Sequence, residues 1–327
     1  MIISITCFFH SNIEFYLENM LFDKFNIVLK DNNMLVHFVS VGQGDAIVIN
    51  LPDGKTLLID AGPKNNSVDY TNYLDENILN SLTHNKLDYV ILTHADADHI
   101  GGALRVLKNY DVQELFMPRF DKNTQTYNDL KSYADANFNY KIIDETFILH
   151  EGDYSIKAFA LESVSDTNES CPIIKVEYLG TSFLFTGDIT EEIEQDFVNQ
   201  YGSELDCDIL KIAHHGSEGS TSQSFLNATT PISAVIQVGA NSYGHPTDQV
   251  LFRLNLNNAE VYRTDVLGDI LFVVGESCGT KIITGDYMIS GINFDFRLFI
   301  LFIDVILLFN MLSVLKKPSK IDGRRQK

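Results

Sequence analysis

Short apolar segments separated by turn residues make up the first part of the chain after residue 33. Residues 34–40 and 45–50 are two such segments, and the stretch 41–44 that links them contains two glycines. Glycine supplies the backbone freedom that a tight turn needs, so this pattern predicts a β-hairpin. A third segment, 55–59, follows another turn and ends at Asp60, which predicts one more strand with a carboxylate at its end.

Farther along the chain, strands are expected to alternate with helices. Apolar residues at mixed three- and four-residue spacing predict an amphipathic helix over 68–82, and runs rich in β-branched residues predict strands. Helices are expected at 68–82, 103–107, 127–137, 190–201 and 221–226, and strands at 87–92, 112–117, 154–161, 173–178, 182–186, 208–212 and 234–238. This alternation, interrupted by hairpins, indicates a layered α/β protein with mixed sheets.

The turn that follows the strand at 87–92 holds the densest cluster of metal-competent side chains. His94, Asp96, Asp98 and His99 lie within six residues, just before a Gly-Gly pair and a helix. A strand-to-helix turn keeps side chains convergent and leaves one side open to substrate, and carboxylate with imidazole suits Zn, Mn or Fe. Taken alone, the cluster also fits a polar, capped turn before a helix.

Composition narrows the class of protein. The chain has 327 residues, of which 45% are hydrophobic, enough for one large domain or two smaller ones. Its four cysteines form no C-x-x-C pair, which argues against a zinc knuckle or a disulfide framework and favours a reducing compartment. The formal charge of −20 counts against a non-specific DNA binder, although two bound divalent ions would reverse the charge where a phosphate binds.

Several motifs occur together in an order that identifies a family. They are Ser40 to Ala46, Leu58 to Gly62, Thr93 to Gly102, Phe185 to Ile189, Leu210 to Ser217, Tyr243 to Pro246 and Tyr262 to Asp265. This set resembles the metallo-β-lactamase superfamily, and more narrowly the soluble domain of ComEC-type competence proteins, over about Leu35 to Leu271. Any one motif is weak, whereas the ordered set is highly specific.

The resemblance implies an αββα sandwich of two mixed sheets with two divalent metal ions, Zn or Mn, at one edge. Each ligand role follows from a matching position: His94 and Asp96 would bind one metal, Asp98 and His99 the other, Asp188 would bridge both, and His214 would complete the second metal. Asp60 would orient the ligand turn from behind. Asp98, His215 and His245 are the expected catalytic residues, with His215 or His245 protonating the leaving group.

The sequence departs from the superfamily pattern at the first metal. Asp96 stands where most members have a second histidine, and no clear histidine for the third motif lies between His150 and Asp188. The first metal therefore has few protein ligands, and we expect it to bind more weakly and to prefer a harder ion such as Mn. Ser40 replaces the aspartate that is usual in the ComEC-type branch.

Five site residues have competing interpretations. Asp60 also suits an ordinary turn, and Asp188, which precedes a helix, also suits an N-cap. His214 and His215 are adjacent, and residues leaving a strand alternate in direction, so we expect only one of them to reach the metals and favour His214. His245 would otherwise be a loop histidine held by the following proline.

The two ends of the chain lie outside the resemblance. We expect residues 1–33 to form a helical extension, 34–285 the hydrolase domain, and 286–327 a hydrophobic segment with a basic tail. Residues 298–315 are long enough for a short membrane span, and the cost of Asp304 is offset by the Leu, Ile and Phe around it. The basic tail and the missing signal peptide favour instead a cytoplasmic protein associated with a membrane or membrane partner through this segment.

The function expected from these features is a metal-dependent hydrolase in which a metal-bridged hydroxide attacks an ester, in the favoured case a phosphodiester of DNA. The choice of substrate rests on the resemblance alone, because one fold serves many reactions. Two alternatives remain open: a phosphocholine-type or other small-molecule esterase, and an accessory metal-binding module without catalysis that docks on a membrane partner.

Overall fold

The computed structural model describes residues 32–64, 85–162, 164, 168, 170–276 and 279–284. The predicted helix at 68–82, the hydrophobic segment 298–315 and almost all of the N-terminal extension lie outside these residues. Within the described part of the chain, no helix is long and apolar enough to cross a membrane.

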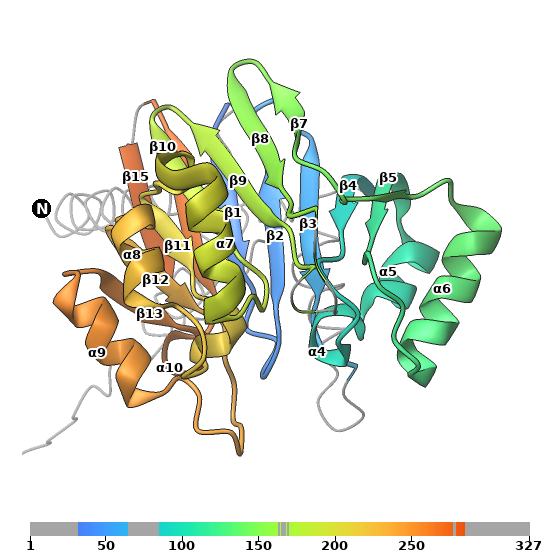
Figure 1. Cartoon of the computed structure of the whole chain (residues 1–327). Helices are drawn as coiled ribbons and strands as arrows, with labels where there is room; N and C mark the ends of the chain where they lie inside the picture. Colours follow the sequence, from blue (N-terminus) through green and yellow to red (C-terminus); the bar gives the residue numbers. More distant parts are fainter. Residues whose placement is uncertain are drawn as a thin grey trace, which may run out of the picture. The chain divides into compact units, whose positions relative to one another are not determined.

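Two mixed sheets form the framework, as predicted (Figure 1). The first has the order β15-β14-β1-β2-β3-β4-β5-β6 and the second β13-β12-β11-β10-β9-β8-β7. The first sheet consists of β1 (Met34–Phe38), β2 (Ala46–Asn50), β3 (Thr56–Ala61), β4 (Lys86–Ile91), β5 (Asp111–Met117), β6 (Lys141–Ile142), β14 (Ile270–Gly275) and β15 (Gly279–Thr284). The second consists of β7 (Phe147–Glu151), β8 (Tyr154–Phe159), β9 (Ile173–Tyr178), β10 (Thr181–Phe185), β11 (Ile209–Lys211), β12 (Ser233–Ile236) and β13 (Glu260–Arg263).

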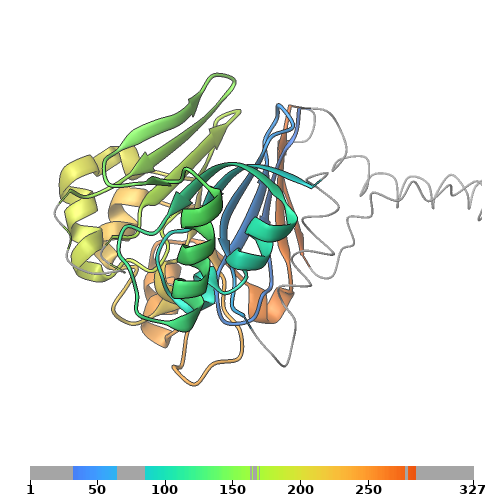
Figure 2. The same ribbon diagram turned by 90° about the vertical axis from the view of Figure 1, so that its right-hand side faces the viewer.

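Helices cover the outer faces of the sheets, with α4 to α6 on the first and α7 and α8 on the second (Figures 1 and 2). The α-helices are α4 (Ala97–Ile100), α5 (Ala103–Asn109), α6 (Gln125–Asn137), α7 (Glu191–Tyr201), α8 (Gln223–Thr229), α9 (Asp248–Leu256) and α10 (Thr264–Leu267). Two 3₁₀ turns, η2 (Gly202–Leu205) and η3 (Ala213–Gly216), follow α7 and β11.

The alternation of side chains along each strand explains the layers. In β2, Ile47 and Ile49 pack between the two sheets, whereas Val48 packs outward under the helices. Phe183 and Leu184 of β10 divide in the same way between the central core and the core beneath α7. Both faces of these central strands are apolar because both are covered, which is the condition for an αββα sandwich.

Strand direction places the site. β3, β4 and β5 are parallel in the first sheet, and β10, β11 and β12 are parallel in the second. The carboxyl ends of parallel strands meet at one edge of a sheet, where loops are free to carry polar residues. The loops after β4, β10, β11 and β12 therefore bring His94, Asp188, His214 and His245 toward the same edge.

Several elements were absent from the sequence-based prediction. Strand β7, helix α9 and the terminal hairpin β14–β15 are examples. In β7, side chains are only partly buried and His150 interrupts the apolar run, so its period is weak. Strand β14 is fully buried on both faces and shows no polar alternation.

Candidate metal centre

Asp60, at the end of β3, anchors the ligand turn. Its carboxylate accepts hydrogen bonds from the backbone N–H of Thr93 at 2.8 Å and from the Thr93 hydroxyl at 2.7 Å. The same carboxylate lies 2.8 Å from Nδ1 of His99. Asp60 is 1% exposed, so these bonds are shielded from water. One carboxylate thus orients both the start of the turn, at Thr93, and His99, which lies six residues farther on.

Four side chains converge in front of this turn. Asp98, His99, Asp188 and His215 each offer one ligand atom, and these atoms all lie within 4.8 Å of one another. Oδ2 of Asp188 is 3.3 Å from Nε2 of His99 and 3.6 Å from Nε2 of His215. Asp98 lies on the side of the group that is open to solvent, and its Oδ2 is 3.3 Å from Nε2 of His215.

His94 extends this group on the side of His99. The two imidazole rings are 4.1 Å apart, and Nε2 of His94 lies 3.9 Å from Oδ2 of Asp188. The Thr93 hydroxyl donates its proton to Asp60, so it accepts a hydrogen bond from Nδ1–H of His94 at 3.0 Å. This arrangement leaves Nε2 of His94 as the unprotonated nitrogen, the form in which imidazole binds a metal.

His99 and His215 are also held through their Nδ1 atoms. Nδ1 of His99 faces the Asp60 carboxylate, and Nδ1 of His215 donates to the backbone oxygen of Gln237 at 2.8 Å. In each case Nε2 points toward Asp188. Among the described residues, Nε2 of His94 and Nε2 of His99 are buried without a hydrogen-bond partner. Three imidazoles with their Nε2 atoms around one carboxylate fit a divalent metal ion.

His214 and His215 lie in an unusual turn after β11. Both residues have left-handed backbone angles, with φ of 50° and 53°. The sequence-based expectation that the side chains of His214 and His215 point in opposite directions assumed strand geometry. This turn instead brings both rings to the site. Nε2 of His214 is 3.9 Å from Oδ2 of Asp188, at the open side, where the side chain is 34% exposed. His215 is 2% exposed and belongs to the four-residue group.

Asp96 and His245 lie at the margin of the group. Asp96 forms an ion pair with Lys122, from the loop before α6, and is not one of the four converging residues. The ring of His245 is 5.8 Å from that of His214. Burial, together with the neighbouring histidines, lowers the pKa of His245.

Asp45 and Lys211 form a buried ion pair behind the group, and the sequence-based prediction assigned a role to neither. Lys211 also donates to the backbone oxygen of Gly187 at 3.1 Å and lies 3.8 Å from Oδ1 of Asp188. Oδ1 of Asp45 lies 3.4 Å from Nδ1 of His215. Lys211 is the last residue of the otherwise apolar, fully buried strand β11. A lysine in such a strand needs a charged partner, and this was the sequence feature that could have predicted the ion pair.

The charges at the site are strongly coupled. Burial alone would lower the pKa of His215, but Asp188 and Asp45 outweigh it and raise that pKa to about 10. The pKa of His99 is raised well above its usual value against the same effect of burial, by Asp188 and Asp60. Burial raises the pKa of Asp188, and the cationic neighbours hold it well below its usual range. In the metal-free protein, protons on imidazole neutralise the carboxylates that a divalent cation would otherwise neutralise.

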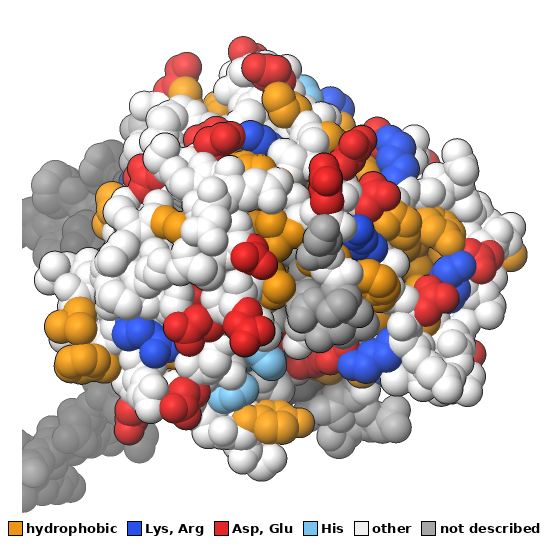
Figure 3. All heavy atoms as spheres, in the orientation of Figure 1, with side chains coloured by type: hydrophobic (Ala, Val, Ile, Leu, Met, Phe, Trp, Pro, Cys, Tyr) orange, Lys and Arg blue, Asp and Glu red, His pale blue; other side chains and the backbone are white. Residues whose placement is uncertain are grey.

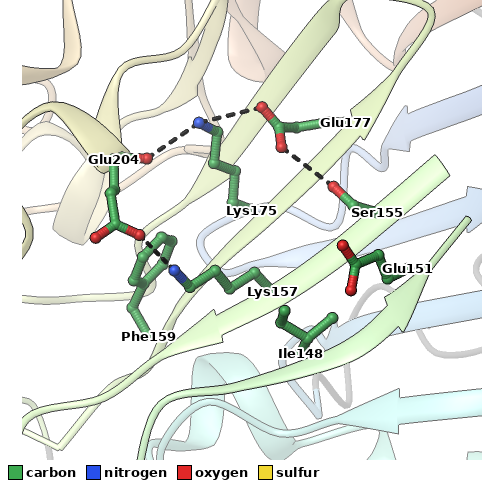
Figure 4. Close-up of a pocket in the computed structure, with 8 residues that line it drawn as sticks. All are labelled: Ile148, Glu151, Ser155, Lys157, Phe159, Lys175, Glu177 and Glu204. Atoms are coloured by element: carbon green, nitrogen blue, oxygen red, sulfur yellow. Dashed lines mark hydrogen bonds and ion pairs between the residues drawn. The ribbon is translucent and has the colours of Figure 1, made fainter.

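A separate hollow of about 310 Å³ lies on the second sheet over β7, β8 and β9, and none of the site residues described above lines it (Figure 4). Two lysines of the hollow form ion pairs: Lys175 lies 3.2 Å from Glu177 and donates to the backbone oxygen of Glu204 at 3.0 Å. Lys157 pairs with the Glu204 carboxylate at 2.5 Å. Both lysines of the hollow are therefore already paired with carboxylates.

The sequence of the chain is similar to several known proteins. Residues 39–239 match the family model of the Metallo-beta-lactamase superfamily. The chain is 30% identical over 277 residues to ComE operon protein 3 of Bacillus subtilis (strain 168), covering 79% of this chain and 35% of that protein. It is 28% identical over 248 residues to Competence protein ComA of Neisseria gonorrhoeae, covering 75% and 33%. Both relatives are ComEC-type competence proteins, and this chain spans about a third of their length.

Among solved structures, the chain is similar to the metallo-beta-lactamase fold protein YhfI from Bacillus subtilis. The sequences are 15% identical, the TM-score is 0.48, and the match covers 74% of this chain and 100% of that chain.

Proposed function

This chain belongs to the metallo-β-lactamase superfamily, and from that premise we propose that it is a metal-dependent phosphodiesterase that acts on nucleic acid. The observation that carries the proposal is the group of Asp98, His99, Asp188 and His215, whose ligand atoms lie within 4.8 Å of one another. The name of one relative, a competence protein, refers to the uptake of DNA and supports nucleic acid as the substrate.

The donor set assigns the metal positions in this proposal. Asp98, His99, Asp188 and His215 would hold one divalent ion, Zn or Mn. His94 and Asp188 would remain for a second ion, and Asp96 would be able to contribute only if its ion pair with Lys122 were broken. The second ion therefore has fewer protein ligands. Two such ions would supply a nucleophile near neutral pH and would neutralise charge on the phosphoryl oxygens.

The remaining histidines flank the position of the substrate. His214 is partly exposed beside Asp188, and His245 lies next to it. Burial and the neighbouring histidines lower the pKa of His245, so as the proton donor it would take up the proton that the attacking water releases and pass it to the leaving oxygen. Because His215 is a proposed metal ligand, His245 rather than His215 is the proposed proton donor.

Hydrolysis by the purified chain in Mn²⁺ or Zn²⁺ tests the proposal. The substrates are single-stranded DNA, bis-p-nitrophenyl phosphate and p-nitrophenyl phosphorylcholine. Asp188→Ala should abolish hydrolysis because it removes the shared ligand. Asp135→Asn, which changes an exposed carboxylate on α6, is the matched control and should retain the wild-type rate.

The pattern across substrates separates the alternatives. Hydrolysis of DNA and of the small diester, lost only in Asp188→Ala, supports the phosphodiesterase. Hydrolysis of the phosphorylcholine ester or the small diester without DNA would replace it with a small-molecule esterase. Equal background rates for wild type and Asp188→Ala on every substrate would leave a metal-binding module without catalysis.

A further inference from the structure

The loop between β12 and α9, residues 237–247, carries an exposed aromatic side chain at the rim of the metal centre. This loop projects from the same edge of the protein as α4 (Figures 1 and 2). Tyr243 is 73% exposed, and its ring is 5.7 Å from the ring of His245. His245 is in turn 5.8 Å from His214, whose Nε2 lies 3.9 Å from Asp188. The rings of Tyr243, His245 and His214 thus form a row that leads from the surface to Asp188, a proposed metal ligand.

Figure 3, in the orientation of Figure 1, shows histidine side chains that reach the surface beside an apolar group at the lower edge of the molecule. Acidic side chains are prominent on the rest of this face, in keeping with the formal charge of −20. The charge of the chain gives little attraction to a phosphate backbone, so the affinity for nucleic acid must come from the metal centre and from uncharged contacts.

Hydrogen bonds from Asn241 hold the exposed part of the loop in place. Oδ1 of Asn241 accepts from the backbone N–H groups of Tyr243 and His245, both at 3.1 Å. Its Nδ2 donates to the backbone oxygens of Gly239 and His245 at 2.9 Å. Gly244 takes a φ of 79°, which favours glycine and turns the chain sharply after Tyr243.

This geometry presents Tyr243 to solvent without the stabilisation that burial of an aromatic ring brings. A ring on a preordered loop loses little conformational entropy when a ligand covers it. The flat face of tyrosine matches the face of a nucleobase, and stacking of this kind contributes about 1–3 kcal/mol per base in single-stranded complexes. It requires an unpaired base, because a base within a duplex is already stacked on both faces.

We propose that Tyr243 is a stacking subsite for an unpaired nucleobase next to the phosphate that binds at Asp188. The inference rests on the proposed function and specifies its substrate as single-stranded nucleic acid. Tyr243 sets specificity by contact with a base, and it takes no part in proton transfer or metal binding.

Binding measured by fluorescence anisotropy tests the subsite. The full chain in Mn²⁺ is titrated into a labelled, cleavage-resistant phosphorothioate oligothymidylate of about eight nucleotides, and into an abasic oligomer of the same length and charge. The wild type should bind the thymidylate more tightly. Tyr243→Ala should weaken that binding about 5- to 150-fold and leave the abasic oligomer unaffected, whereas Tyr243→Phe should bind as the wild type does.

Phe252→Ala is the matched control, because Phe252 is an aromatic residue of α9 with 61% exposure that takes no part in the row of rings. It should bind both oligomers like the wild type. Equal affinity of the wild type for the two oligomers, no measurable binding of either, or an unchanged affinity in Tyr243→Ala would overturn the inference.

Hydrolysis measured in parallel separates this inference from the proposed function. Base-dependent binding without hydrolysis of any diester would refute the phosphodiesterase and leave the stacking subsite intact. Hydrolysis without base-dependent binding would support the phosphodiesterase and refute the stacking subsite.

Discussion

The buried pair of Lys211 and Asp45 offers the sharpest test of how the centre is supported. Lys211 is 1% exposed and Asp45 is also 1% exposed, so neither charge is solvated by water. Burial by itself raises the pKa of Asp45, and the charges of Lys211, His99 and His215 reverse that effect and lower it. Replacing Lys211 with Met, which preserves much of the volume, leaves the Asp45 carboxylate buried without its ammonium partner.

Breaking a buried ion pair from one side costs about 3–5 kcal/mol. The imidazole of His215 remains 3.4 Å from Asp45 and compensates part of the charge, so we expect a loss near 3 kcal/mol, at the lower end of that range. In a domain of this size, each kcal/mol lowers Tm by roughly 2–4 °C, so Lys211→Met should melt about 6–12 °C below the wild type. The second variant, Lys211→Met with Asp45→Asn, removes both charges and should recover 1 kcal/mol or more, about the size of other couplings between contacting residues.

Urea and thermal unfolding of the metal-free chain measure these differences. Lys131→Met is the control, because Lys131 forms an exposed i,i+4 pair with Asp135 on α6 and should cost about 0.5 kcal/mol or less. The reasoning fails if Lys211→Met unfolds within 1 kcal/mol of the wild type, or if the double variant is no more stable than Lys211→Met.

Three further predictions concern the charges and ligands. At pH 7 the raised pKa values of His99 and His215 keep both rings protonated, so binding of Zn²⁺ should release about two protons, seen as a buffer-dependent heat in calorimetry; no release would contradict the ligand assignment. Asp60→Asn should weaken Zn²⁺ affinity about 10- to 100-fold in a chelator competition, and an unchanged affinity would show that Asp60 does not orient His99. Burial lowers the pKa of His37 to about 3, below the unfolded value of about 6.5. The contribution of the neutral imidazole to the free energy of unfolding is therefore present above pH 6.5 and is lost as pH falls toward 3. His37→Leu should flatten the fall in unfolding free energy between about pH 6.5 and 4.5, and parallel profiles for the variant and the wild type would refute this.

The sequence by itself determined the mixed α/β fold, the order of most strands and helices, and the edge at which the polar residues gather. Periodicity is a local property, so β1 to β3 and the turn at His94 to His99 were readable from neighbouring residues. Strands without alternation, such as β14, were not, because a strand covered on both faces has no polar period.

The tertiary structure decided which side chains meet. The left-handed turn at His214 and His215 brings both rings toward Asp188, an outcome that the alternation of a strand does not predict. Contacts between distant segments also pair Asp45 with Lys211 and hold the imidazoles by their Nδ1 atoms. A sequence records which groups are available, whereas the choice among them depends on backbone direction and on burial, and both arise only when the two sheets pack together.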